Sequence, residues 1–308
     1  MMKKNKVIRF LAYTLIIYCT LAGLGCEPSP KSRGKAEILF SPAPFSVPMI
    51  EARLIFLKDY LTKETDWKIE MRVSPSDIDS FLKMVETEKV AFSLQNAYFY
   101  LLLAEKKGAV PIVKTISLDG RAERRGLIVC RDDSQVKSVA DLRGKQVLST
   151  SRFHVGGFLS QWIFLKDQGL NPERDLIYKF GDTQEEILEK VASGRAEVGF
   201  IREDVLQAAI KTRGQMPRIK VIATTSYCPT TCIVKYPGTD PDLVEKVKTA
   251  LLKLNFKNPS HRFILERLRI SGFAPASPED YADFRNLLTS YGLLPARPIP
   301  PQKTTQSQ

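Results

Sequence analysis

A few polar residues have the types and spacing that bind an anion. His154 is followed by Val155, Gly156 and Gly157, where a helix is expected to begin. Free amide groups at a helix start favour an anion through their geometry and the helix dipole. Arg202 follows an apolar run, and its guanidinium fork can grip a carboxylate, sulfo or phosphoryl group. These residues predict a site for a small oxyanion.

Sequence patterns of enzymes and metal sites are missing. The two histidines, His154 and His261, stand in distant contexts, whereas a zinc site needs further ligands. The chain has neither a GxxxxGK[ST] phosphate loop nor a GxSxG nucleophile elbow. We therefore expect no enzyme, no metal and no cofactor. Two alternatives of other classes are a secreted Ser/His hydrolase that uses His154 and a structural membrane-associated lipoprotein.

The charge distribution argues against a nucleic-acid partner. Lys and Arg number 46 against 34 Asp and Glu, a net charge of +12. Four of the basic residues precede position 10, and the others are interleaved with acids instead of forming a run or stripe. An anionic small ligand or a membrane surface fits this pattern better, and we expect a monomer.

The first residues have the order of a secretory signal peptide. A basic start, Met1–Arg9, precedes the apolar segment 10–21, which is shorter than the ~20 residues that span a bilayer. Small residues follow and lead to Cys26. We expect a signal peptide over residues 1–25 and a polar tether over 26–35.

Cys26 directly after small residues resembles a bacterial lipobox, although Gly23 stands where Leu is usual and Leu24 where a small residue is usual. The resemblance implies lipid on Cys26 and an extracytoplasmic, membrane-anchored protein. It does not decide which membrane holds the anchor. An uncleaved anchor and a plain signal peptide are the alternatives.

Three cysteines remain in the body of the chain, Cys130, Cys228 and Cys232. Outside the cytoplasm an odd count means one disulfide and a spare thiol, or no disulfide. Cys228 and Cys232 are spaced to close a tight loop, but both outcomes stay open.

Short apolar runs alternate with segments of helical periodicity. We expect strands over 36–40, 68–73, 90–94, 111–116, 126–131, 147–149, 176–180, 196–201, 218–224 and 232–236. We expect helices over 48–63, 75–89, 96–107, 156–169, 183–193, 241–254, 259–268 and 278–291, and a loose tail over 291–308. Repeated strand–helix units predict an α/β fold with parallel sheets covered on both faces.

Ligands of such sheets lie at the carboxyl ends of the strands. The loops at these ends add seven candidate ligand contacts to those above: Phe45, Gln95, Asn96, Tyr98, Ser149, Thr150 and Tyr227. For each candidate a structural role is the alternative. Gln95, Asn96 and Tyr98 would cap a helix or pack in the core, and the rings of Phe45 and Tyr227 would be ordinary core.

The candidates of the proposed anion site also have structural alternatives. Arg202 would form a salt bridge beside Glu203 and Asp204. His154 would be either a proton-sensitive anion ligand near its usual pKa of about 6.5 or a polar loop residue. Gly156 and Gly157 would permit close approach to the backbone or tight helix packing. Arg124 and Arg125 are expected in a solvated turn.

Several segments resemble the phosphonate-binding branch of the periplasmic solute-binding proteins. They are 90–98, 140–145, 169–175, 193–200 and 271–273, with Tyr281 near the end, and their order along residues 36–290 is more telling than any one motif. Two segments depart from the family. Its Ser-Thr-Ser-Gly run is His154–Gly157 here, and its Gly-Ser-His-Asp loop is Gly181–Gln184. The departures favour an oxyanion in general over phosphonate in particular.

The resemblance implies a two-lobed type II periplasmic binding protein, in which each lobe is a mostly parallel sheet flanked by helices. Lobe 1 would comprise residues 36–127 plus 231–290, and lobe 2 residues 128–230. Two hinge strands, 126–131 and 231–236, would join the lobes. The implied function is capture of a small, phosphonate- or phosphate-like solute between the lobes for an ABC importer. Arg202 also resembles an arginine of relatives that serve membrane sensor kinases, so presentation to such a kinase is the alternative.

Overall fold

The computed structural model describes residues 34–40, 47–74, 77–181, 183–214 and 216–294. The expected signal peptide, Cys26, nearly all of the tether, Phe45 and the tail from residue 295 lie outside these ranges. Within them, every helix is too short or too polar to cross a membrane.

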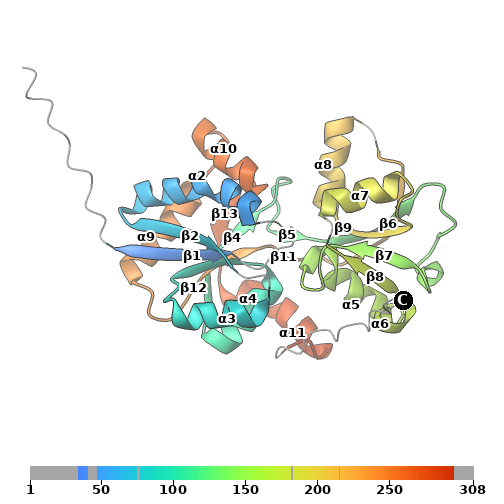
Figure 1. The fold of residues 1–308 in the computed structure, drawn as a ribbon, viewed down its shortest axis with the longest axis horizontal. Helices are drawn as coiled ribbons and strands as arrows, with labels where there is room; N and C mark the ends of the chain where they lie inside the picture. Colours follow the sequence, from blue (N-terminus) through green and yellow to red (C-terminus); the bar gives the residue numbers. More distant parts are fainter. Residues whose placement is uncertain (1–33, 41–46, 75–76, 182, 215, 295–308) are drawn as a thin grey trace, which may run out of the picture. The chain divides into compact units, whose positions relative to one another are not determined.

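Two β-sheets organise the described residues, and each is the centre of one α/β lobe, as predicted (Figure 1). The six-stranded sheet has the order β13-β4-β12-β3-β1-β2. Its strands are β1 (Lys35–Phe40), β2 (Lys68–Val73), β3 (Phe92–Gln95), β4 (Val110–Ile116), β12 (Cys232–Lys235) and β13 (Gly272–Pro275). The five-stranded sheet has the order β10-β6-β9-β7-β8. Its strands are β6 (Gly126–Arg131), β7 (Gln146–Ser149), β8 (Ile177–Phe180), β9 (Val198–Arg202) and β10 (Ile219–Thr224).

Both sheets are mixed, whereas the sequence predicts mostly parallel ones. β1 is parallel to β2 and β3, but β12 is antiparallel to β3 and β4. β7 is parallel to β8 and β9, but β6 is antiparallel to β9 and β10. The physical reason is the route of the chain. β6 and β12 enter their sheets straight from the other lobe, without the crossover helix that a parallel neighbour requires.

The two segments that connect the sheets pair with each other. β5 (Glu123–Arg124) lies between β4 and β6, and β11 (Cys228–Pro229) lies between β10 and β12. Together they form an antiparallel ribbon in which Cys228 stands opposite Arg124. The segments predicted as hinges, 126–131 and 231–236, lie mostly inside β6 and β12, so the connection itself is this ribbon and its flanks.

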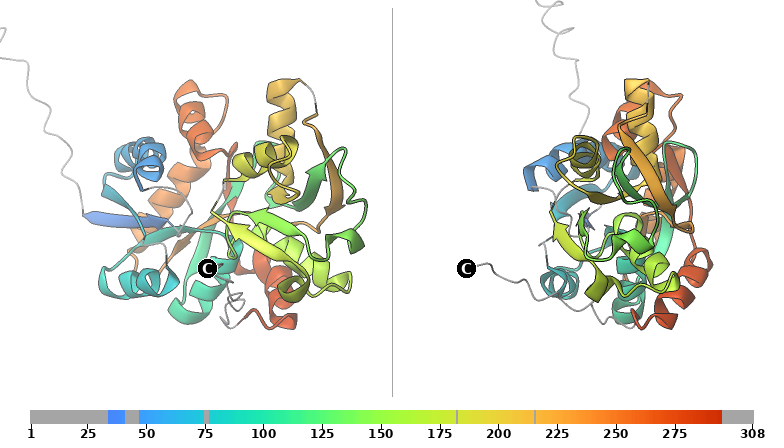
Figure 2. Two further views of the ribbon diagram at one scale, coloured as in Figure 1. Left: turned by 45° about the vertical axis from the view of Figure 1, so that its right-hand side comes forward. Right: turned by 90° about the vertical axis from the view of Figure 1, so that its right-hand side faces the viewer.

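Helices cover both faces of each sheet (Figures 1 and 2). On the six-stranded sheet α2 (Val47–Thr65), α9 (Pro241–Lys253) and α10 (Pro259–Leu268) share one face, and α3 (Ile78–Thr87), α4 (Ala97–Lys107) and α11 (Ala282–Ser290) lie on the other. On the five-stranded sheet α7 (Gln184–Ala192) and α8 (Glu203–Arg213) lie opposite α5 (Leu159–Asp167) and α6 (Pro172–Asp175). Short 3-10 turns are η1 (Ala140–Leu142), η2 (Val155–Gly157) and η3 (Pro278–Tyr281).

Apolar periodicity explains the elements that the sequence predicts correctly. Leu54, Leu57 and Leu61, which share one face of α2, are all buried. Ile38 and Leu39 are neighbours on β1 and belong to different core clusters, because successive strand residues point to opposite faces. The prediction misses α6, α8, β5, β11 and β13, which are short or bury few apolar residues.

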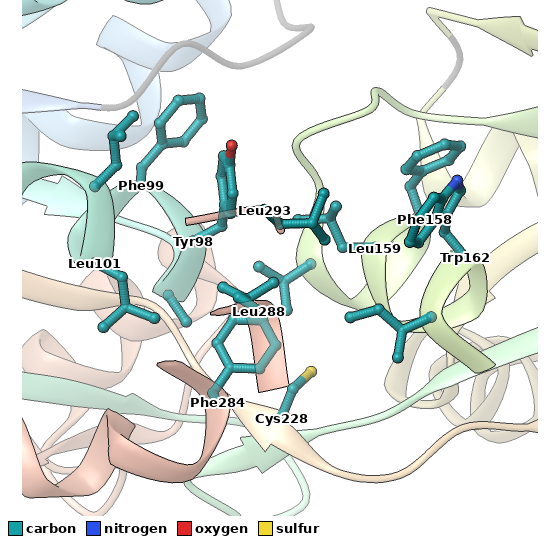
Figure 3. Packing of buried hydrophobic residues seen from close by; sticks show 14 of the residues in the cluster. Tyr98, Phe99, Leu101, Phe158, Leu159, Trp162, Cys228, Phe284, Leu288 and Leu293 are labelled. Carbon is teal, nitrogen blue, oxygen red and sulfur yellow. The ribbon is translucent and has the colours of Figure 1, made fainter. Parts of the chain in front are cut away.

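One core cluster contains side chains of both lobes. Tyr98 of α4, Leu159 of α5 and Leu288 of α11 belong to it (Figure 3). Beyond α11, Leu293 and Leu294 are also buried in it, although the sequence predicts a loose tail from residue 291. The C-terminal segment therefore joins the lobes in addition to the ribbon.

The three cysteines of the described residues, Cys130, Cys228 and Cys232, are free and buried. Of the two outcomes left open by the sequence, the structure shows the one without a disulfide among them.

Gly199 of β9 lies where α7 packs on the sheet. A Cβ there would stand 2.7 Å from Cγ2 of Ile187 and 2.9 Å from Cγ2 of Val191. We expect Gly199→Ala to lower the free energy of unfolding by about 1–3 kcal/mol through overpacking, measured by urea unfolding. The control is Gly272→Ala, where the nearest atom is the Leu254 carbonyl oxygen at 3.5 Å. Equal losses in the two variants would contradict this account.

Candidate ligand-binding site

A cavity of about 260 Å³ opens where the carboxyl ends of strands from both sheets meet the ribbon. Six of the predicted ligand contacts line it: Asn96, Thr150, His154, Val155, Gly156 and Arg202. The loops that the sequence singles out therefore do converge, as expected for strand ends in an α/β fold.

The structure places other candidates off the cavity wall. Ser149 is buried, and its hydroxyl donates to the Gly157 carbonyl at 2.7 Å. Gln95 is also buried, and Tyr98 stacks on Phe153 with ring centroids 6.2 Å apart. Outside the cavity lining, Tyr227 lies beneath the guanidinium groups of Arg121 and Arg125. Tyr98 therefore has the core position that the sequence analysis gave as its alternative, whereas Gln95 is buried with neither polar atom of its side chain partnered among the described residues.

Several lining residues are not candidates in the sequence analysis: Arg53, Phe99, Arg124, Phe153, Gln184 and Arg269. Gln184 is the last residue of the Gly181–Gln184 segment that stands for the family's Gly-Ser-His-Asp loop, and this position could have pointed to it. Arg53 and Arg269 belong to α2 and to the end of α10, which no strand-end rule selects.

Gln184 connects three elements at the cavity. Its helix, α7, begins with a capping box in which Thr183 and Glu186 satisfy each other's backbone amides. The Gln184 side chain donates to Thr150 Oγ1 at 3.0 Å and accepts from the Arg202 backbone amide at 2.7 Å. The ends of β7 and β9 are thereby fixed relative to the start of α7.

Two glycines let side chains approach the backbone closely. A Cβ on Gly156 would lie 3.1 Å from Cγ of Arg202, and one on Gly157 would lie 2.2 Å from Nε2 of Gln184. The groups that approach this backbone are thus side chains of the protein itself. These glycines form η2, and α5 starts only at Leu159, later than the predicted helix start. The expectation of an anion at this helix start is therefore not supported by the backbone.

Arg202 is paired with Asp204. Its Nε and Nη2 donate to the two carboxylate oxygens at 2.7 and 3.0 Å. Burial opposes both charges, but their attraction prevails. The pKa of Arg202 is raised, and that of Asp204 is lowered to about 2. The structure shows the salt bridge that the sequence analysis gave as the alternative, and Arg202 also lines the cavity.

Arg124 does not lie in the solvated turn that the sequence predicts. It lies half-buried on β5 and lines the cavity. Its Nε donates to Ser117 Oγ at 2.9 Å, while among the described residues no partner meets Nη1 or Nη2. Burial, with the nearby charge of Arg202 as the next cause, lowers the pKa of Arg124 to about 10. The group is still charged at neutral pH. Arg125, by contrast, is paired with Glu203.

His154 has unsatisfied ring nitrogens. Nδ1 is completely buried without a partner, and no hydrogen bond to the other nitrogen is found among the described residues. Burial, followed by the charges of Arg202 and Arg124, lowers the pKa of His154 from 6.5 to about 3. The ring is therefore neutral in the free protein, and a proton-sensitive ligand with a pKa near 6.5 is not what the structure shows.

Two polar contacts run from lobe to lobe beside the cavity. Asn96 caps α4 through the Phe99 amide and donates from Nδ2 to the Phe153 carbonyl oxygen at 3.1 Å. Arg269 forms an ion pair with Glu185 of α7. Asn96 thus has the capping role and a place on the cavity wall. Among the described residues no cluster of three metal-ligand side chains occurs.

The fold and this cavity define a two-lobed α/β binding protein, and comparisons with known proteins agree. A binding component of a phosphonate ABC transporter from Pseudomonas aeruginosa superposes with a TM-score of 0.68 and 13% identity, over 82% of this chain and 85% of that one. PhnD1 from Prochlorococcus marinus, in complex with methylphosphonate, gives 0.70 and 13%, over 86% and 99%. XAC2383 from Xanthomonas citri, bound to chloride, gives 0.65 and 18%, over 84% and 97%.

The family model described as "ABC transporter, phosphonate, periplasmic substrate-binding protein" matches residues 40–281. The chain belongs to this family. Its members are extracytoplasmic substrate-binding components and not enzymes, so the cavity is a place for binding and not for a reaction.

The neutral state of His154 makes stability depend on pH. In the unfolded chain the ring takes a proton below pH 6.5, which the folded protein resists until about pH 3. We therefore expect the free energy of unfolding to fall with pH below 6.5, by up to about 1.4 kcal/mol per pH unit from this residue. His154→Asn should flatten the curve between pH 6.5 and 4.5 in urea unfolding. Parallel curves for wild type and His154→Asn would contradict the assignment.

Proposed function

We propose that the protein captures a small oxyanion of the phosphonate or phosphate type in the central cavity and delivers it to an ABC permease. The two lobes would be residues 36–127 plus 231–290 and residues 128–230, closing on the ligand. A lipid on Cys26 would hold the protein at the membrane. Delivery to a permease rests on membership of the family.

The observation that carries the proposal is the guanidinium of Arg124. Arg124 lines the cavity, and among the described residues neither Nη atom has a hydrogen-bond partner. Burial removes part of the water that would otherwise hydrate this charge. An oxyanion would supply two acceptor oxygens in the fork geometry that guanidinium groups prefer. Thr150 and Arg202 line the same cavity.

The size and position of the cavity also support this function. A volume of about 260 Å³ lies below the 300–1,000 Å³ typical of drug-sized ligands, which fits a small solute. The wall draws on both lobes, with Arg53 and Asn96 from one and Thr150 and Arg202 from the other. A ligand that contacts both sides stabilises the closed arrangement by these contacts.

Arg124→Gln tests the anion site. We expect the wild-type protein to show a ligand-dependent rise in melting temperature with methylphosphonate, phosphite or phosphate, and much less with cationic solutes. Titration calorimetry should show the affinity of the best ligand lowered by about 30-fold or more in Arg124→Gln, because a charged donor is lost. Arg121→Gln, which alters an exposed arginine beside Tyr227, is the control. Unchanged affinity in Arg124→Gln would refute this site.

Cys26→Ser tests the anchor. In cells that process lipoproteins, we expect the wild-type protein to partition into the detergent phase of Triton X-114 and to carry a diacylglyceryl group on its first residue in mass spectra. Cys26→Ser should lack the lipid mass, because only a thiol at this position accepts the diacylglyceryl group. An identical lipid mass in both proteins would rule out Cys26 as the attachment point.

A further inference from the structure

The arginines that line the cavity come from two parts of the fold. Arg124 lies on the ribbon, and Arg202 lies at the end of β9 in the five-stranded sheet. Arg53 lies on α2 and Arg269 directly follows α10, so both belong to helical segments that cover the six-stranded sheet. We call Arg53 and Arg269 the helix pair. The cavity wall therefore has cationic groups on the side of each sheet.

The helix pair shares one carboxylate among the described residues of the cavity wall. That carboxylate belongs to Glu185 of α7, which forms an ion pair with Arg269. The pKa of Arg53 is lowered, first by burial and then by the positive charge of Arg269, and the attraction of Glu185 does not offset these two effects. The two guanidinium groups are thus close enough to repel each other. Two cations and one carboxylate leave a net positive charge at this part of the wall.

Arg124 and Arg202 form a second group of charges with one carboxylate, that of Asp204. Asp204 binds Arg202, and the charges of Arg202 and Asp204 both act on Arg124. This group also has one more positive than negative charge. The described wall therefore carries an excess positive charge in each of two places, and a ligand with a single anionic group can contact only one of them closely.

Arg269 has a backbone conformation that is unfavourable for its residue type. It caps the end of α10 with φ 57° and ψ 42°, in the left-handed region where glycine is the usual residue. Among the described residues, Asp66 and Lys89 are the other non-glycine residues with positive φ. Strained residues of this kind cluster at ligand sites, where the side chain is needed in a particular place. The strain at Arg269 is an observation independent of its charge.

The remaining wall on this side of the cavity offers little to a second polar group. Its described residues other than the helix pair are Leu94, Asn96, Phe99 and Leu268. Asn96 already caps α4 and donates to the Phe153 carbonyl oxygen. A ligand end that faces this side meets two guanidinium groups among apolar side chains. A cationic end is repelled there, whereas an anionic end accepts charge-assisted hydrogen bonds.

We propose that the ligand carries two anionic groups on a short linker: a phosphonate- or phosphate-type head at Arg124, and a carboxylate or second phosphoryl group held by Arg53 and Arg269. The inference rests on the proposed function and deepens it by naming the class of ligand. Such a ligand contacts helices of the six-stranded sheet with one end and the ribbon with the other. Glu185 repels the second anionic group and limits how tightly it is held.

The experiment compares phosphonates that share a head and differ at the other end, by titration calorimetry at neutral pH on the full-length protein. Phosphonoacetate ends in a carboxylate, methylenediphosphonate in a second phosphonate, ethylphosphonate in a methyl group and 2-aminoethylphosphonate in an ammonium group. We expect one or both of the ligands with two anionic groups to bind at least about tenfold more tightly than ethylphosphonate, because charged hydrogen bonds are added. The ligand with the ammonium group should bind more weakly than ethylphosphonate.

Variants of the helix pair show whether these arginines make the difference. The measured quantity is the selectivity, the affinity of the tighter of the two doubly anionic ligands divided by that of ethylphosphonate. Arg53→Gln and Arg269→Gly should each lower the selectivity by about fivefold or more. Glu185→Gln should raise it, because a repelling charge is removed. Arg124→Gln should weaken both ligands by similar factors.

Two further measurements separate ligand contact from structural support. Arg269→Gly removes the strain of the left-handed backbone, so the melting temperature without ligand should be close to or above that of the wild type. Arg53→Lys keeps the charge and should recover part of the selectivity that Arg53→Gln loses. The matched control is Arg267→Gln on α10, whose guanidinium lies over the rings of Phe56 and Phe263 outside the cavity lining. It should leave the selectivity unchanged.

The outcomes distinguish the inference from the function beneath it. If ethylphosphonate or 2-aminoethylphosphonate binds as tightly as both doubly anionic ligands, or if the helix-pair variants weaken all ligands equally, the inference is overturned and the proposed function stands. If neither these phosphonates nor phosphate or phosphite bind the wild-type protein, the proposed function falls and the inference with it. A selectivity that drops in Arg53→Gln and rises in Glu185→Gln supports both.

Discussion

A guanidinium group can leave bulk water only if something replaces its hydration, and this constraint shapes the whole site. Arg202 meets it within the protein, because Asp204 accepts from both Nε and Nη2. Arg124 meets it in part, because among the described residues only Ser117 accepts from its guanidinium. Several neighbouring residues accommodate or hold these two arginines. Gly156 leaves room for the stem of Arg202, and Gln184 holds the amide of Arg202 in place. Burial, followed by these two charges, lowers the pKa of His154.

The position of Arg124 joins ligand binding to the arrangement of the lobes. The residue lies on the ribbon that links the two sheets, and its carbonyl accepts from the Cys228 thiol on the other strand of that ribbon. A rotation of one lobe against the other moves the ribbon and therefore the guanidinium. Under the proposed function, binding energy gained at Arg124 would be available only in the arrangement that also brings Thr150 and His154 to the cavity, and capture would thereby be coupled to closure.

Local patterns explain why much of the fold could be predicted. β2, β6 and α10 have the predicted bounds, because apolar runs and proline or asparagine caps are local signals. The strand-end rule also found the loops that line the cavity. Arg124 could not be found in this way. Its two-residue strand has no apolar pattern, and its partner Cys228 lies 104 positions away in the sequence. The mixed strand directions in the two sheets could not be predicted for the same reason, because they depend on where the chain crosses between the lobes.

The departure from the family's sequence pattern at residues 154–157 changes which groups can bind an anion at the cavity. Where the family has a Ser-Thr-Ser-Gly run, this chain has His154–Gly157, which removes hydroxyl donors and adds an imidazole. Hydroxyl groups serve an anion of any protonation state, because each can donate or accept. A neutral imidazole has one donor nitrogen and one acceptor nitrogen. Gly156 stands at the last hydroxyl position of that run and leaves room for the stem of Arg202, so an arginine lies at the cavity wall where the run would place a hydroxyl group.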